Sequence, residues 1–218
     1  MINDKIIELK QRLTEFATHI EKMIERGIDG LSKRDVGIFS KILEADESRA
    51  NSMEIEIDEL CTLLIAQFHP KAVALRTVLM IMKMNNDLER MGDHAVNICI
   101  SGISLIEYPP VKELIDIPRM ADEVKKMLKD SIDSYLNQDI NLARDVCYRD
   151  GKIDGLRDRI IRELIACMTK DGSVISPALQ LMNITRNLER IADLTTNICE
   201  DVIFMVEGKV IKHHMEDK

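Results

Sequence analysis

The sequence predicts an all-α fold: a tandem duplication of a three-helix bundle, with six long antiparallel helices in all. The composition favours helices, because 45% of the residues are hydrophobic, 31% are charged, and Trp is absent. Apolar residues recur every three or four positions, and no stretch alternates strongly with a period of two. The segment 88–99 also returns in register at 188–199. We therefore expect two halves, 1–108 and 109–218, against the alternative of one six-helix array without distinct domains.

In the first half, the apolar spacing predicts helices over about 2–27, 32–68 and 71–106. The first is expected to end at Gly27, shortly before the Asp29-Gly30 pair, because glycine often follows the last turn of a helix. Pro70 separates the second helix from the third, since proline cannot continue a helix.

The second half repeats this plan. Apolar stripes predict helices over about 120–135, 140–169 and 174–207, with a turn at 171–173. The Tyr-Pro-Pro sequence at 108–110 marks the boundary between the halves, because residues that precede proline avoid the helical conformation.

The net charge, the cysteines and the apolar runs indicate which partners and which cellular compartment to expect. The formal net charge is −8, whereas nucleic-acid binding requires clustered Lys and Arg, so we expect no nucleic-acid partner. The five cysteines never form a CxxC pair and are expected to be reduced, buried thiols of a cytoplasmic protein. Neither a signal peptide nor a run of membrane-spanning length is recognisable, so we expect no membrane insertion.

The repeated segment carries acidic side chains at the same places in both copies. Glu89 and Asp93 lie one helical turn apart, as do Glu189 and Asp193, and an Asn follows each pair after one more turn. For a single pair of this kind, the ordinary interpretation is a solvated face paired with nearby arginines. Because the pairs recur in register, a binding task shared by both halves explains them better.

The middle helix of each half supplies a second set of candidate ligands. Asp150 and Asp154 lie four residues apart, and we align Glu47 and Asn51 with them. If the middle and last helices are neighbours, the four side chains of each half face one another. Such an oxygen-rich set suits iron, manganese, magnesium or calcium, with zinc as a further choice. Because Asn51 carries no charge, the second-half site is expected to be the stronger. The predicted metal ligands are Glu47, Asn51, Glu89, Asp93, Asp150, Asp154, Glu189 and Asp193.

The segments LERMGDHAVNI at 88–98 and LERIADLTTNI at 188–198 resemble the paired signature of the PhoU family, the accessory regulators of phosphate uptake in bacteria and archaea. The resemblance extends over essentially the whole chain. It implies E(D)xxxD motifs that bind iron or zinc clusters at the protein surface, and Asn51 stands where the family usually has Asp. It further implies a homodimer that acts with the phosphate ABC transporter ATPase and a sensor histidine kinase to restrain the phosphate-starvation response, recruited through them to the inner face of the membrane.

Two other functions remain open from the sequence. A di-metal carboxylate enzyme is disfavoured, because none of the five histidines follows a Glu by three residues as in the helical di-iron oxidases. No nucleophile elbow, phosphate-binding Gly-rich loop or HExxH motif is present either, so we expect no enzymatic activity. A helical adaptor that binds no metal is the other alternative.

Overall fold

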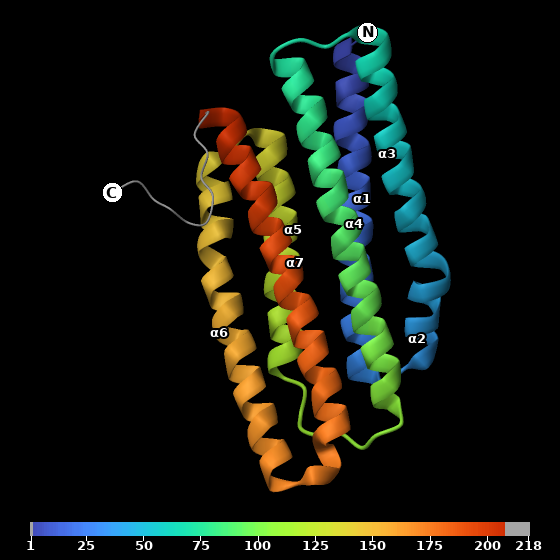
Figure 1. The fold of residues 1–218 in the computed structure, drawn as a ribbon, viewed down its shortest axis with the longest axis vertical. Helices are drawn as coiled ribbons and strands as arrows, with labels where there is room; N and C mark the ends of the chain where they lie inside the picture. Colours follow the sequence, from blue (N-terminus) through green and yellow to red (C-terminus); the bar gives the residue numbers. More distant parts are fainter. Residues whose placement is uncertain (1, 208–218) are drawn as a thin grey trace.

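The computed structural model describes residues 2–207 of the chain and confirms the all-α, tandem-bundle prediction (Figure 1). The long helices run antiparallel within each half, joined by short turns. In chain order the elements are α1 (Ile2–Lys33), α2 (Val36–Lys41), the π-helical turn η1 (Ile42–Asp46), α3 (Glu47–Phe68), α4 (Val73–Ile106), α5 (Asp116–Asn137), α6 (Ile140–Lys170), the 3-10 turn η2 (Gly172–Val174) and α7 (Ile175–Glu207).

The two bundles lie side by side, with α1 and α4 of the first half packed against α5 and α7 of the second (Figure 1). The inward-facing apolar side chains of both halves form one continuous cluster, which includes Phe16, Met91, Tyr135 and Ile191. Helices α3 and α6 lie at opposite outer edges. Among the helices within residues 2–207, none combines the length and apolarity needed to span a membrane.

The first helix is longer than predicted, because α1 continues through Gly27 and Gly30 to Lys33. Gly30 does not end the helix; it makes room for the buried ring of Phe39, whose Cε1 atom would lie 2.8 Å from a β-carbon at this position. Gly102 of α4 flanks the same ring. The glycines therefore serve close packing here, a role that helical periodicity does not reveal.

The second predicted helix is interrupted. Asp35 caps a short α2 by accepting a hydrogen bond from the backbone amide of Gly37. The five residues of η1 then form a π-helical turn before α3 begins. Since a π turn changes the facing of every residue that follows it, the register of α3 cannot be obtained by counting from the start of the predicted helix.

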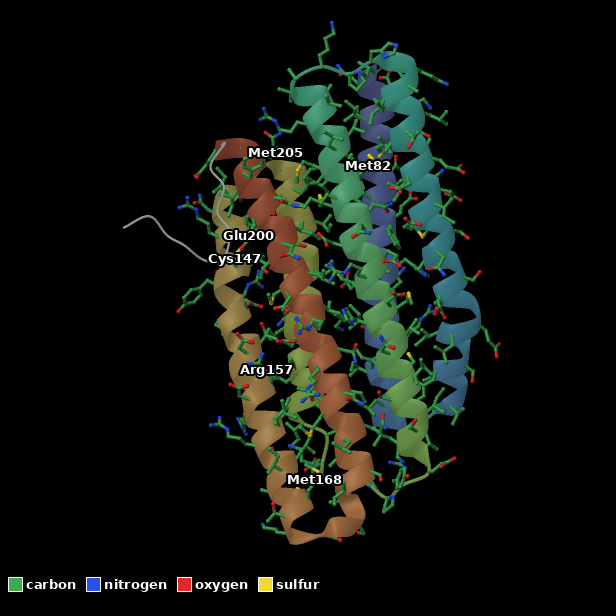
Figure 2. The ribbon with its side chains drawn as sticks, viewed as in Figure 1. Met82, Cys147, Arg157, Met168, Glu200 and Met205 are labelled. Atoms are coloured by element: carbon green, nitrogen blue, oxygen red, sulfur yellow. The ribbon has the colours of Figure 1, made fainter. Side chains whose placement is uncertain are left out.

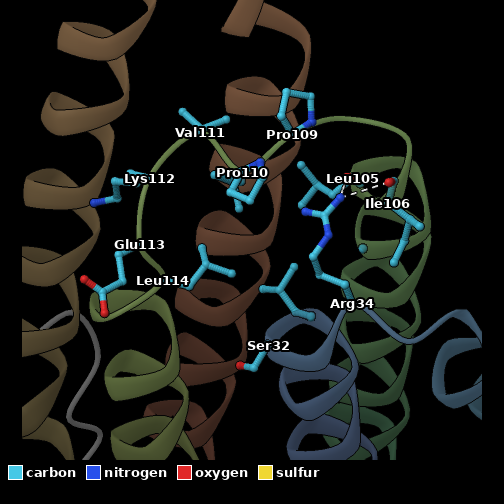
Figure 3. A pocket seen from close by; sticks show the side chains of 13 residues that line it. Ser32, Arg34, Leu105, Ile106, Pro109, Pro110, Val111, Lys112, Glu113 and Leu114 are labelled. Atoms are coloured by element: carbon cyan, nitrogen blue, oxygen red, sulfur yellow. Dashed lines mark hydrogen bonds between the residues drawn. The ribbon is translucent and has the colours of Figure 1, made fainter.

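The linker between the halves, residues 107–115, is held to the first bundle by Arg34. This residue has a positive φ of 54° just after α1. Its guanidinium donates hydrogen bonds to the carbonyls of Leu105 and Ile106 at the end of α4 (Figure 3) and to the carbonyl of Tyr108 in the linker. A largely apolar cavity of about 320 Å³ lies beneath the linker, between Pro110, Leu114 and the end of α1. From its composition, we expect the sequence after Gly208 to be a polar tail, and this segment lies outside the described residues.

Candidate carboxylate sites

In the second half, an arginine lies between the predicted ligands of the two helices. This residue is Arg157 of α6 (Figure 2). Its Nη1 is 2.8 Å from Asp154 Oδ1 on its own helix and 2.6 Å from Glu189 Oε1 on α7. The predicted facing of Asp154 and Glu189 across the α6–α7 seam is therefore confirmed. The positive charge that joins them belongs to a side chain of the protein itself.

The other two predicted ligands of this half lie nearby. Burial, followed by the charges of Glu189 and Asp154, raises the pKa of Asp193, although Arg190 lies 3.2 Å away and opposes the shift. Asp150 is half-buried on α6, one turn before Asp154. The second half thus concentrates acidic side chains on one seam and neutralises part of their charge with arginine.

In the first half, the carboxylate that approaches Glu89 comes from Glu54. Burial is the main cause that raises the pKa of Glu89, and the charges of Asp93 and Glu54 raise it further. The helix register is fixed by the Asn85 side chain of α4, which donates hydrogen bonds to the Glu54 carbonyl at 2.9 Å and to Asp58 Oδ1 at 3.1 Å.

This register corrects the alignment of the two middle helices. The seam pairs Glu54 with Glu89 as it pairs Asp154 with Glu189, so residues of the two halves correspond at the constant offset of the repeated motif. Aligning Asn51 with Asp154 was therefore wrong by three residues. Asn51 is exposed and Glu47 half-buried on α3, and among the described residues neither forms a hydrogen bond or an ion pair with Glu89 or Asp93.

Glu54 and Asp58 are the acidic residues that the sequence reasoning missed. Their spacing, Glu54-Ile55-Glu56-Ile57-Asp58, is itself an ExxxD pattern. Carrying the offset of the repeated segment into the middle helix would have identified both. We instead aligned residues 50–53 with residues 153–156, although the two segments share no identical residue.

The two carboxylate sets differ in their counter-charge. Ile57 occupies the position that corresponds to Arg157, so the first-half seam lacks the bridging guanidinium. Within residues 2–207, no three His, Cys, Asp or Glu side chains are already arranged to hold a metal ion. As placed, the second-half set does not fit a metal, because Arg157 occupies the space between its carboxylates. In the first half, mutual repulsion between Glu54, Glu89 and Asp93 favours a cation, but the side chains must converge to bind it.

A separate polar layer lies where α4 meets α7, between the bundles. His94 Nδ1 is 2.8 Å from Asn187 Oδ1, and Lys83 pairs with Asp201. Asp87 is buried in the same layer, and its Oδ2 atom has no hydrogen-bond partner among the described residues. Burial, with a contribution from the charge of Asp201, raises the pKa of Asp87 to about 6. The contact between the halves therefore contains a buried carboxyl group whose charge is only partly compensated by Arg90, 3.8 Å from its Oδ1 atom.

Together these features define a class: a duplicated three-helix bundle that gathers acidic side chains on the seam between the middle and last helices of each half. The PhoU domain family matches the chain twice, over residues 13–101 and 117–202. The chain belongs to the PhoU family.

Relatives with similar sequences cover nearly the whole chain. The phosphate-specific transport system accessory protein PhoU homolog of Aquifex aeolicus is 34% identical over 97% of this chain and 96% of its own length. The PhoU protein of Escherichia coli is 28% identical over 97% of this chain and 87% of its own. The crystal structure of PhoU from Pseudomonas aeruginosa superposes with a TM-score of 0.90 at 30% identity, covering 96% of this chain and 100% of the other.

Proposed function

We propose that this protein is a non-enzymatic accessory regulator of phosphate transport that restrains the phosphate-starvation response. The observation that carries the proposal is similarity over nearly the full length, in both halves, to proteins named as accessory proteins of the phosphate-specific transport system. The proposed partners are the ATPase of the phosphate ABC transporter and a sensor histidine kinase. In this proposal a cytoplasmic homodimer reaches the inner face of the membrane through these partners.

Deletion of the gene in the native organism tests the proposed regulation. In phosphate-rich medium, we expect the deletion strain to raise its secreted phosphatase activity and to alter its uptake of labelled phosphate, because a restraint is lost. A plasmid copy of the wild-type gene should restore both. Unchanged phosphatase activity and unchanged uptake in the deletion strain would contradict the proposal.

We also propose that the first-half carboxylates bind iron or zinc, with Glu54 joining Glu89 and Asp93. Support comes from the pKa of Glu89, which is raised by burial and then by the charges of Asp93 and Glu54, and from the Ile at the position of Arg157. A divalent ion would neutralise these oxygens, which are the hard ligands that such ions accept. Metal binding in the second half, at Asp150, Asp154, Glu189 and Asp193, additionally requires the Arg157 side chain to move away. We therefore propose that the first-half site is the stronger, which reverses the order expected from the sequence.

Elemental analysis of untagged protein tests the metal sites. We expect the pair Glu89→Gln and Asp93→Asn to remove most of the bound iron or zinc, because it deletes two charges from the seam that has Ile57 at the position of Arg157. The matched pair Glu189→Gln and Asp193→Asn should have the smaller effect. Equal metal content in the wild type and in both double variants would exclude metal binding at these seams.

A metal-free adaptor is the second candidate, and Arg157 is the observation that favours it. Its guanidinium contacts Asp154, Asp158 and Glu189, so one seam is already neutralised by the chain itself. If the protein is an adaptor, none of these preparations should contain iron or zinc. A plasmid copy of the gene with Glu89→Gln and Asp93→Asn should then restore the deletion strain as well as the wild-type gene does. The same preparations and strains therefore separate the two candidates.

A further inference from the structure

Helix α3 presents an apolar outward face. It packs against α1 and α4 and lies at the outer edge of the first bundle (Figure 1). Ile55 and Leu63 point away from these neighbours and are 54% and 51% exposed. These two large aliphatic side chains lie two turns apart and form an apolar row, whose exposure to water is energetically unfavourable.

A shallow groove of about 500 Å³ follows this row. One wall is the i, i+4 ridge of Glu54, Asp58 and Thr62, and the other is the ridge of Ile55, Glu59 and Leu63. Grooves between i, i+4 ridges are the surfaces into which the side-chain ridge of a second helix packs. The shape of the groove therefore suits a helix.

The acidic residues of α3 have no ionic partners of their own. The helix carries five of them, Glu47, Glu54, Glu56, Asp58 and Glu59, against the single base Arg49. In the part of the chain that the structure describes, none of the five forms a salt bridge. Acidic residues of α1, α5, α6 and α7, by contrast, do form salt bridges.

The duplicated half provides an internal comparison. At the matching positions, α6 has Gly155, Arg159 and Glu163 in place of Ile55, Glu59 and Leu63. Nε of Arg159 lies 3.1 Å from Glu163 Oε1, so this edge is polar and compensated within the chain. The apolar row and the unpaired acids are thus particular to α3 and do not follow from its place at the edge of a bundle.

We infer that the groove on α3 docks a helix of a partner protein, one whose apolar ridge is flanked by Lys or Arg. The apolar ridge would cover Ile55 and Leu63, and the basic side chains would neutralise Asp58 and Glu59. Charge complementarity decides this occupant, because the groove is acidic along both ridges. The inference requires neither a bound metal nor a role in phosphate transport, so it can fail or succeed independently of the proposed function.

A synthetic peptide tests the groove on the full-length protein. The probe is a labelled amphipathic helix with Leu at i, i+4 positions flanked by Lys and Arg, compared with a shuffled peptide of the same composition. We expect fluorescence anisotropy at physiological salt to show the amphipathic peptide binding at least about tenfold more tightly, a difference of about 1.4 kcal/mol. Hydrogen exchange should show new protection over 54–63, with and without EDTA.

Matched variants locate the binding. The pair Ile55→Ser and Leu63→Ser should weaken binding about tenfold, and Glu59→Arg should weaken it and reduce its salt dependence. Ile165→Ser on α6 and Glu107→Arg at the end of α4 make the same chemical changes elsewhere and should leave binding unchanged. Thermal melts confirm that each variant is folded. Equal binding of the shuffled peptide, or equal losses in the control variants, would overturn the inference. So would dissociation of a self-associated wild-type protein by the Ile55 and Leu63 variants, since the occupant would then be a second copy.

Discussion

Replacing Gly102 with alanine is expected to lower the free energy of unfolding by about 1–3 kcal/mol, the usual cost of overpacking a core. A β-carbon at this position would lie 2.8 Å from Cε1 of Phe39 and closer still to Cζ of the same ring. The ring is fully buried and is held on its other side by Gly30 of α1. It therefore cannot move aside without shifting α1 or α4. Urea denaturation followed by circular dichroism measures the change.

Gly155→Ala is the matched control for that substitution. Gly155 also lies within a helix, but nothing lies within 4 Å of the β-carbon that alanine would add. Here alanine should stabilise the protein by about 0.5–1 kcal/mol, because glycine loses more backbone entropy in a helix. The two substitutions are chemically identical and have opposite expected signs. Equal effects would contradict the packing role assigned to Gly102.

The second large effect is expected for Asp87→Asn, which should raise the free energy of unfolding by about 1–3 kcal/mol at pH 7.5. Burial raises the pKa of Asp87 to about 6 from an ordinary value of 3.8. A carboxyl whose pKa is raised by folding favours the folded state while it is protonated. That contribution is complete below about pH 3.8 and is lost as the pH rises through 6. Asn keeps the neutral shape at every pH, and Asn187 already occupies the matching position in the second half.

The pH dependence of the difference is the decisive measurement. The stability gap between wild type and Asp87→Asn should be small near pH 4 and should widen up to about pH 6.5, because the wild-type carboxylate becomes charged over that range. Asp122→Asn, at an exposed position on α5, should produce no comparable gap. A gap that does not vary with pH would show that Asp87 affects stability through packing and not through its charge.

The fold was largely predictable, because the helical periodicity extends over long segments and the repeated segment indicates the duplication. The spacing of apolar residues placed α4, α6 and α7 within a few residues of their observed bounds. The errors lie where tertiary packing overrides local preference. Glycine at 27 and 30 indicated the end of a helix, whereas Phe39 requires a close approach at Gly30. The π-helical turn at Ile42–Asp46 has no compositional signal, so the interruption of the second helix was not predicted.

The candidate sites were predictable in part for the same reason. Glu189 and Asp154 were expected to face each other, and they do so around Arg157. In the first half, the expected partners of Glu89 were Glu47 and Asn51, but the residue that approaches Glu89 is Glu54, three residues after Asn51 on α3. Partner choice across a seam depends on which side of a helix each residue faces, and a single extra residue rotates that side by about 100°. Whether either seam binds a metal stays a prediction.

Arg157 also has a consequence for how two copies of one bundle can diverge after duplication. Both halves inherit the same helical plan and the same acidic seam, yet one holds a guanidinium where the other has Ile57. The residue at this one position therefore decides whether the seam contains a positive charge that belongs to the chain itself. Divergence of this kind does not change the backbone fold, so the two halves can acquire different binding properties while they keep the same structure.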